Sequence, residues 1–473
     1  MKSAGRIVAG CILVLLTVPG CRTVPVAEQV TSGIPQAVSM CEKLGVQQEW
    51  AEVPSAWWRE FQDPSLNALV ESVLDGNSSL SASWRRLEQS GYAAAAARSQ
   101  RSPQMTLGGF GGVSRRYQMP GGALDEVELW GTSAGASYEL DVWRRVASAV
   151  GQAELIAQAS FYDYEAMAVS LAAAVCEAWF DVNERMLAVD LLRAQLASSE
   201  EKLGAVEERY RLGQGAMLDV YQQQELVANV RSQIPAAEVA VDLARNRLAV
   251  LAGVMPGERE SEGYGEGRLP EAPPPVTLDI DSDVAEYRPD VMAALAMLGA
   301  AERGAALALR DRFPVLRLNA SVASQSEGVD GLFDEITSEA LLGLTLPLSD
   351  GGRRRAETGQ ARSLAAERLE LYSETVLQAM REIHDARILE SSQAETVRRL
   401  EEELEAARRT LALSDERYRG GLTDYLGVLA AQTRVYQLER AVLGARRLRL
   451  SYRVQFCRAL AGSDVGSRKR TEE

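Results

Sequence analysis

Residues 208–213 have the sequence Glu-Arg-Tyr-Arg-Leu-Gly, and residues 416–421 repeat it as Glu-Arg-Tyr-Arg-Gly-Gly. The two segments lie 208 positions apart, and a stretch rich in Gln, Ala, Leu and Val follows each of them. Each stretch then ends in Leu-Ala-Gly, at residues 251–253 and 460–462. A period this long indicates duplication of a whole architectural unit, because solenoid repeats are much shorter.

Alternating segments upstream of both copies predict four β-strands. In residues 130–142 apolar and polar side chains alternate, which is typical of a strand with one apolar face. Residues 105–113 form its weaker, glycine-rich partner, and the connection 114–129 is expected to be a loop. The second copy repeats the pattern in residues 316–322 and 342–348. Each strand has about the ~9–11 residues that a tilted strand needs to cross a membrane.

Long helical segments follow each strand pair. No proline occurs in residues 143–212 or 353–420, and continuous helices of this length would span roughly 100 Å. Glycine-containing turns end both segments, and return helices are expected at 217–252 and 424–461. A shorter helix, over residues 65–102, precedes the first strand pair. Each copy therefore reads as helix, hairpin, long helix, turn and return helix.

The first twenty residues predict a secretory signal peptide. Lys2 and Arg6 precede an apolar run at residues 7–18, which is too short for an ordinary transmembrane helix. Residues 18–21, Val-Pro-Gly-Cys, are similar to a bacterial lipoprotein cleavage site, although proline is atypical there. Cys21 is therefore the candidate lipid-attachment residue, and no cofactor is expected besides this covalent lipid. Secretion with simple cleavage nearby is the alternative.

The composition argues against several classes of function. The formal net charge of −15 argues against nucleic acid as a partner. Beyond the leader and Cys21, the cysteines at positions 41, 176 and 457 have neither metal-site spacing nor a disulfide framework. The single histidine, His384, cannot form a metal site alone, and no phosphate-binding loop motif occurs. We therefore expect neither a metal ion nor enzyme activity.

These features divide the chain into six predicted segments. In order they are the signal peptide (1–20), the lipid-anchored N-terminal arm (21–64), the first structural repeat (65–253), a linker rich in proline and glycine (254–287), the second structural repeat (288–462) and a polar C-terminal tail (463–473).

The predicted elements indicate an α+β membrane protein that must form oligomers. Four strands cannot stand alone in a bilayer, because their open edges would leave backbone groups unpaired in hydrocarbon. Outer-membrane barrels start at about eight strands, and three chains would supply twelve, enough to enclose a lumen. Polar side chains such as Ser133, Glu139 and Asn319 would then line water. This reasoning predicts a closed oligomeric conduit continued by a helical barrel, and does not itself choose three chains over two.

Three segments resemble TolC-like outer-membrane efflux lipoproteins. Residues 57–66 (WWREFQDPSL) resemble the family's W-x-x-F-x-D-P-x-L opening. Residues 288–291 (RPDV), followed by 298–301 (LGAA), resemble its mid-chain segment. Residues 418–432 (YRGGLTDYLGVLAAQ) resemble its C-terminal Y-x-x-G-x-x-x-Y-L-x-V-L-x-A-Q motif. The resemblance covers essentially the whole mature chain, with the motifs in the family's order.

The resemblance implies a homotrimer with a twelve-stranded outer-membrane barrel on a periplasmic α-helical barrel. Such proteins are passive exit ducts for small molecules across the periplasm and outer membrane. Their partners are a periplasmic adaptor protein and an inner-membrane pump of the resistance-nodulation-division type, with outer-membrane lipid around the barrel. The implied location is the outer membrane of the Gram-negative envelope.

The resemblance also implies a gate at the periplasmic end of the helices, closed at rest by bonds between the hairpins of the two copies. Arg417 and Tyr418 match positions of the gate latch, and Asp219 matches its acidic partner in the first copy. A helix cap with a packed aromatic ring is the structural alternative for Arg417 and Tyr418.

Two further positions belong to the implied constriction. Leu426 matches an apolar constriction position, and Asp424 could supply charge nearby. The family often has aspartate one turn after this leucine, where the present chain has Ala430. An acidic ring at the constriction is therefore not expected from that position.

Two alternative functions remain open at this stage. The first is the outer-membrane outlet of a type I protein secretion system, because a passive tube carries few residues specific to its cargo. The lipoprotein motif and the RPDV segment favour small-molecule efflux. The second is a structural periplasmic coiled-coil lipoprotein, against which the four alternating strands argue.

Overall fold

The computed structural model describes residues 56–118, 123–257, 264–274 and 288–460, all of which belong to one compact unit. The predicted signal peptide, the candidate lipid-attachment residue Cys21 and the predicted tail lie outside the described residues.

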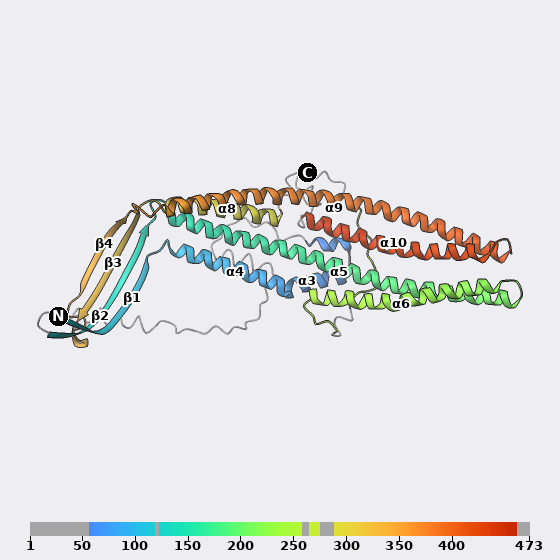
Figure 1. The fold of residues 1–473 in the computed structure, drawn as a ribbon, viewed down its shortest axis with the longest axis horizontal. Coiled ribbons are helices and arrows are strands. Elements are labelled where there is room, and N and C mark those ends of the chain that lie inside the picture. The colour runs from blue at the N-terminus through green and yellow to red at the C-terminus, as the bar shows by residue number, and fades with distance from the viewer. Residues whose placement is uncertain (1–55, 119–122, 258–263, 275–287, 461–473) are drawn as a thin grey trace. The chain divides into compact units, whose positions relative to one another are not determined.

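One antiparallel sheet of four strands occupies one end of the long helices (Figure 1). Its strands, in spatial as well as chain order, are β1 (Gln104–Gln118), β2 (Ala123–Leu140), β3 (Val315–Ser326) and β4 (Thr337–Thr345). The register aligns Met105 with Ala136, Ala136 with Ala320, and Ala320 with Ala340. Directly paired residues point to the same face, so the apolar positions of all four strands share one face.

The sequence-based strand limits need correction in both strand pairs. β1 and β2 extend into the expected loop 114–129, because cross-strand pairing continues outward and Arg115 forms an ion pair with Glu126 at 3.0 Å. β4 ends at Thr345, so the expected strand residues Leu346 and Leu348 lie beyond it. The reason is that alternation reports which residues share a face, while pairing to a neighbouring strand decides where a strand ends.

The described residues also form seven α-helices and two short 3-10 helices. They are η1 (Trp57–Phe61), α3 (Pro64–Gly76), α4 (Ser78–Ser99), α5 (Arg145–Arg211), α6 (Met217–Leu251), α8 (Pro289–Arg310), η3 (Val329–Gly331), α9 (Arg353–Arg419) and α10 (Tyr425–Ala459). The helices α5 and α9 each have 67 residues, and α6 and α10 each have 35. The resulting fold is α+β, mostly helical with a small sheet, as the sequence predicted.

The helix expected over residues 65–102 is divided in two at Asn77. The Asn77 carboxamide oxygen accepts hydrogen bonds from the backbone N–H groups of Ser79 at 2.9 Å and Leu80 at 3.2 Å. These bonds cap a new helix, because the first N–H groups of a helix have no partner within it. The Asn77 amide also donates to the Leu251 carbonyl, which ties this break to the end of α6.

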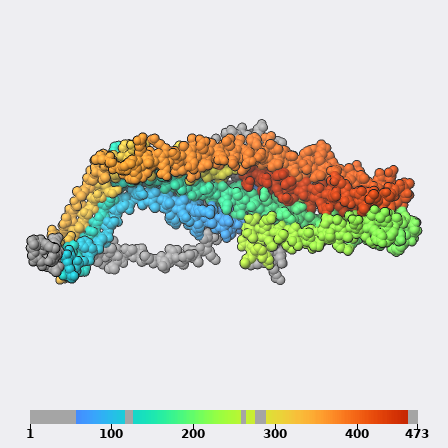
Figure 2. All heavy atoms as spheres, in the orientation of Figure 1, coloured from blue at the N-terminus to red at the C-terminus, as the bar shows by residue number. Residues whose placement is uncertain are grey.

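The helices pack side by side, with α5 at the centre. α5 contacts α4, α6, α8 and α10, and α9 contacts α8 and α10. Away from the sheet, the green surface of α6 and the red surface of α10 lie next to each other (Figure 2). Among the described helices, α8 alone is long and apolar enough to cross a membrane by length and composition. It packs against α5 and α9.

The RPDV segment ties three helices together through a buried arginine. Arg288 donates to the Ala459 carbonyl at the end of α10 at 3.0 Å, and pairs with Asp290 and with Glu382 of α9. A buried guanidinium requires such partners, because an unpaired charge in a protein interior costs several kcal/mol. The segment therefore fixes the start of α8 against α9 and α10.

The WWREFQDP segment packs into a large cluster of buried apolar side chains. The Phe61 and Phe180 rings meet edge to face at 5.0 Å, which packs η1 against α5. The buried Asp63 carboxylate accepts from the backbone N–H groups of Ser65 and Leu66 at 3.1 Å and from the Trp179 indole at 2.9 Å. Asp63 therefore caps α3 and also attaches it to α5.

We expect Asp63→Ala to destabilise the protein by about 2–4 kcal/mol, because it removes a helix cap and leaves the Trp179 N–H without its acceptor. Thermal unfolding in detergent, followed by tryptophan fluorescence, would measure the loss. Asp75→Ala is the matched control, since Asp75 is an exposed residue of the same helix. Equal unfolding temperatures for the two variants would contradict the role given to Asp63.

Candidate functional site and family

The two helix-to-helix turns far from the sheet have the same backbone geometry. Gly213 and Gly421 adopt positive φ angles of 71° and 70°, which glycine tolerates and other residues rarely adopt. The N–H of Gln214 donates to the Arg209 carbonyl at 2.8 Å, and that of Leu422 donates to the Arg417 carbonyl at 2.9 Å. These bonds close the C-termini of α5 and α9 and turn the chain into α6 and α10.

A hydrogen bond joins these two hairpins. The Tyr418 hydroxyl, at the end of α9, donates to Asp219 Oδ2, at the start of α6, at 2.9 Å. Tyr418 is buried, and its ring lies 4.9 Å from the ring of Tyr425. Burial, and then the bond to Asp219, raise the pKa of Tyr418 to about 12. The hydroxyl therefore keeps its proton at neutral pH, and the bond is lost only as the pH rises towards 12.

Arg209 completes this contact from α5. Its guanidinium carbon lies 5.0 Å from the centre of the Tyr418 ring, a cation–π distance, and it donates to the Arg419 carbonyl at 3.2 Å. We call Asp219, Tyr418 and Arg209 the latch triad. The three side chains link α5 and α6 to α9, so their contacts hold the ends of the two hairpins together.

A buried polar network continues from the latch triad along the helices. Tyr425 donates to the Gln223 carbonyl oxygen at 2.8 Å, and the Gln223 amide donates to the Ser199 carbonyl at 2.8 Å. Further along, the Ser199 hydroxyl lies 3.0 Å from that of Tyr436, to which Gln432 donates at 2.8 Å. These bonds connect α5 and α6 to α10 in an interior where unpaired polar groups are costly.

The structure places the other expected site residues outside the latch triad. Arg417 is exposed, and its side chain makes no ion pair or hydrogen bond with another described residue. Leu426 is exposed in the single chain, as is Ala430. The Asp424 carboxylate caps α10 by accepting from the Gly427 N–H at 3.4 Å. Of the expected residues, Asp219 and Tyr418 are thus brought together directly.

Sequence reasoning missed Arg209, Gln223, Ser199, Gln432 and Tyr436 as parts of this region. Arg209 is the counterpart of Arg417 in the repeated segment, so the duplication indicated both arginines but not which one contacts the tyrosine. The two glutamines had a sequence signal. Gln223 lies between Val220 and Val227, and Gln432 between Val428 and Val435, at spacings of three and four residues that place each on the apolar face of its helix. The structure buries both fully.

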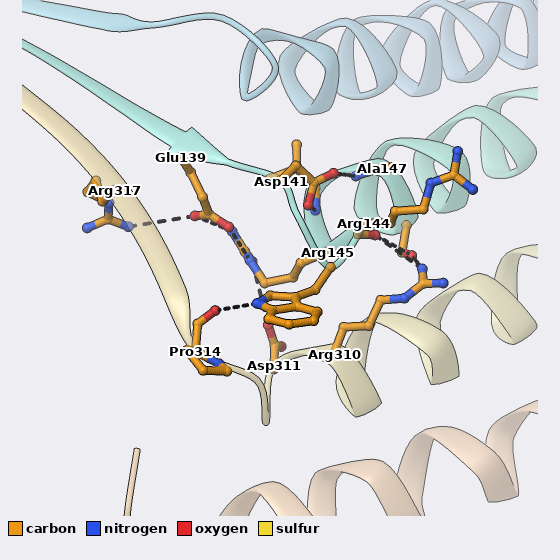
Figure 3. Close-up of polar contacts among 12 residues, drawn as sticks. Glu139, Asp141, Arg144, Arg145, Ala147, Arg310, Asp311, Pro314 and Arg317 are labelled. Atoms are coloured by element: carbon orange, nitrogen blue, oxygen red, sulfur yellow. Dashed lines mark hydrogen bonds and ion pairs between the residues drawn. The ribbon is translucent and has the colours of Figure 1, made fainter. Parts of the chain in front are cut away.

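A second polar cluster lies where β2 meets α5 (Figure 3). Glu139 accepts two hydrogen bonds from the Arg145 guanidinium, at 2.7 and 2.9 Å, and lies 3.8 Å from Arg317 of β3. Asp141 caps α5 by accepting from the N–H groups of Val146 and Ala147. Bidentate carboxylate–arginine pairing is geometrically specific, so this cluster fixes how the strands continue into the helix.

Among the residues that the structure describes, no group of three or more His, Cys, Asp or Glu side chains could hold a metal ion. The two described cysteines, Cys176 and Cys457, are buried and unbonded to each other. Burial raises the pKa of both thiols. Both are therefore expected to stay protonated and poorly nucleophilic at neutral pH.

The comparisons with known proteins agree with this architecture. The chain is 28% identical over 420 residues to the pyoverdine export outer membrane protein OpmQ of Pseudomonas aeruginosa, covering 86% of this chain and 87% of the relative. It is 28% identical over 473 residues to the outer membrane protein OprJ of the same species, covering 95% of each.

Solved structures share the fold. The outer-membrane channel OprN matches with a TM-score of 0.81 and 24% identity, over 93% of this chain and 98% of that one. The outer membrane protein VceC of Vibrio cholerae matches with a TM-score of 0.79 and 24% identity, over 87% of this chain and 99% of that one.

A family model of the outer membrane efflux proteins matches residues 69–254 and 282–462, which together make up most of the sequence. The two matched stretches contain all four strands and both hairpins of long helices. The chain therefore belongs to the outer membrane efflux protein family, and it is an efflux channel protein of the Gram-negative outer membrane with a periplasmic extension.

Proposed function

We propose that three copies of this chain form a passive, gated exit duct, with a twelve-stranded barrel in the outer membrane and a helical barrel in the periplasm. One observation carries the proposal: a four-stranded sheet with an exposed apolar face continues directly into helices of 67 residues. A helix of that length spans roughly 100 Å, enough to reach far into the periplasm.

The open edges of the sheet support an oligomer. β1 and β4 each have one strand neighbour among the described residues, so one edge of each is unpaired within the chain. Side chains on the apolar face, including Met105, Leu342 and Leu344, are more than 60% exposed. A bilayer would accept these side chains, while the unpaired edges require strands from other copies.

The equal lengths of corresponding elements support a duplicated architecture. α4 and α8 have 22 residues each, as α5 matches α9 and α6 matches α10. We propose residues 65–253 and 288–462 as the two structural repeats, joined by the linker 254–287. In a trimer, two repeats per chain would give six similar units around the duct.

The latch triad supports a gate at the end of the helices that lies away from the sheet. We propose that Asp219 and Tyr418 hold neighbouring hairpins together in the closed state, with Arg209 over the tyrosine ring. Leu426 and Asp424 would lie near the constriction, and Arg417 would contact a neighbouring chain. Opening would then be a population shift towards separated hairpins, favoured by contact with another component.

Membership of the family supports a proposal for the partners and the cargo. We propose a periplasmic adaptor and an inner-membrane pump as partners, and lipid attachment at Cys21. The names of relatives support small-molecule cargo, since one is a pyoverdine export protein and another belongs to a toluene efflux pump of Pseudomonas putida. Small toxic or exported compounds are therefore the proposed cargo class.

Single-channel conductance in planar bilayers, together with the oligomeric mass in detergent, tests this function. We expect a mass of three chains and discrete pores that are mostly closed at rest. A monomer that forms no pores would overturn the duct, and a stable oligomer of any other size would overturn the twelve-stranded barrel.

A further inference from the structure

Exposed arginines recur where the strands meet the helices. Arg101 lies between α4 and β1, Arg144 between β2 and α5, Arg312 between α8 and β3, and Arg355 in the first turn of α9. We call these four residues the basic collar. The spacing to the following proline is the same for Arg101 before Pro103 and for Arg312 before Pro314.

The strand register places the basic collar at one level of the molecule. Gln104 pairs with Ser137 and Leu316 pairs with Leu140, so Arg101 and Arg312 both fall near the last residues of β2. The Arg310 guanidinium donates to the Arg144 carbonyl at 3.1 Å, which brings the end of α8 to the start of α5 (Figure 3). Thr358 donates to the Ala308 carbonyl, which aligns the first turns of α9 with the last turn of α8.

The charges of the basic collar have no acidic partner among the described residues, unlike those of the neighbouring Arg145 and Arg354. Arg145 is neutralised by Glu139 and Asp311, and Arg354 by Asp350. The collar side chains are exposed and make no ion pair or hydrogen bond with another described residue. Four exposed positive charges at one level attract a partner that carries several negative charges there.

Apolar side chains accompany the basic collar. The Trp143 and Phe313 rings stack at 5.4 Å with 25° between their planes, and the Trp143 indole donates to the Pro314 carbonyl at 2.8 Å. Both rings are 43% exposed, and two further apolar side chains are exposed as well, Val142, next to Trp143 in the sequence, and Leu348, between β4 and α9. Aromatic rings combined with arginine are typical of the boundary between lipid tails and headgroups.

The opposite end of the sheet carries a net negative charge, because acidic residues there outnumber the two arginines of the β1–β2 hairpin, Arg115 and Arg116. The connection between β3 and β4, residues 327–336, contains four acidic residues and no lysine or arginine. In the proposed duct the collar end faces the periplasm and the acidic end faces outward. The charge of the basic collar is therefore specific to one membrane surface.

We propose that the basic collar binds the phosphate groups of anionic phospholipids in the periplasmic leaflet of the outer membrane, with Trp143 and Phe313 at the headgroup boundary. The inference rests on the proposed duct, because only membrane-inserted strands bring the collar to a bilayer surface. Lipid binding there resists displacement of the strands along the membrane normal. It also gives the channel a preference for membranes rich in phosphatidylglycerol or cardiolipin.

The proposal can be tested by titrating the purified full-length protein in detergent with phosphatidylglycerol or with phosphatidylcholine of identical acyl chains. Native mass spectrometry counts the lipid molecules bound to the protein. We expect wild type to bind phosphatidylglycerol about tenfold more tightly, and 1 M NaCl to weaken this preference. The quadruple variant Arg101→Gln, Arg144→Gln, Arg312→Gln, Arg355→Gln should lose most of it. The single variants Arg144→Gln and Arg312→Gln should each lower the affinity for phosphatidylglycerol severalfold. They replace the quadruple variant in the test if that variant does not assemble.

The matched control replaces four arginines of α9 that lie on the order of 40 Å or more from the collar, by helix length. These are Arg381, Arg398, Arg399 and Arg409, whose side chains are all more than half exposed. The control has the same charge change and should keep the lipid preference. Equal binding of both lipids by wild type, or an equal loss in control and collar variants, would overturn the proposal.

Conductance of the same samples separates this inference from the duct. Collar variants that still form pores but lose the lipid preference would support the basic collar within a working duct. Pores formed by a wild type without lipid preference would overturn the basic collar and leave the duct intact. A wild type that shows the lipid preference without forming pores would overturn the duct and leave the basic collar as a binding site for anionic lipid.

Discussion

Removing the latch triad's hydrogen bond, in Asp219→Ala with Tyr418→Phe, should raise the resting conductance of the channel by at least about tenfold. A hydrogen bond to a charged group contributes about 1.5–3 kcal/mol, and each 1.4 kcal/mol changes an equilibrium tenfold. The bond joins two hairpins through the hydroxyl of a buried tyrosine, so its loss favours the separated state. Planar-bilayer recordings of the purified double variant would measure the open probability directly.

Tyr210→Phe is the matched control for this variant. Tyr210 occupies the position of Tyr418 in the first copy, yet it is 45% exposed and its hydroxyl has no hydrogen-bond partner among the described residues. Gly427 stands where the second copy would need the counterpart of Asp219. Wild-type conductance in the double variant would count against the latch, as would an equal increase in Tyr210→Phe.

Arg453→Met should lower the free energy of unfolding by about 3–5 kcal/mol, because it leaves a buried carboxylate without its partner. Arg453 of α10 is 5% exposed and pairs with Glu390 of α9, itself 3% exposed, at 3.0 Å. Arg453 also pairs with Glu60 of η1. Urea unfolding in detergent, followed by tryptophan fluorescence, would measure the change.

The same variant should recover part of its stability at acidic pH. Burial raises the pKa of Glu390, and Arg453 counteracts that shift in the wild type. A carboxyl whose folded pKa lies above its unfolded value stabilises the fold at low pH, and this contribution is lost as the pH rises through the folded value. The deficit of Arg453→Met should therefore be larger at pH 8 than at pH 5.

Two further variants show whether the stability loss of Arg453→Met comes from the unpaired buried charge or from lost packing. Adding Glu390→Gln to Arg453→Met should restore much of the stability, since the remaining group is neutral. Arg446→Met, two turns earlier in α10, removes an exposed ion pair with Glu401 and should cost no more than about 1 kcal/mol. A similar loss in Arg446→Met and Arg453→Met would contradict the importance of the buried pair.

The classes and order of the elements were accessible from the sequence. Period-two alternation predicted the four strands, and the absence of proline with glycine at the ends predicted the long helices, because these signals are local. The lengths of the helices and strands were harder to predict from the sequence. The break at Asn77 depends partly on a bond to Leu251, and the ends of β1 and β2 depend on their pairing with each other.

The sequence by itself determined the α+β fold class and the resemblance to a family of efflux channels, and that resemblance singled out Asp219 and Tyr418. The tertiary structure decided that Arg209, and not its counterpart Arg417, lies over Tyr418, and that Tyr425, Gln223 and Ser199 extend the contact as a buried network. The physical reason is distance along the chain. Asp219 and Tyr418 are 199 residues apart, and only the packing of α6 against α9 and α10 selects which of two nearly identical motifs meets a carboxylate.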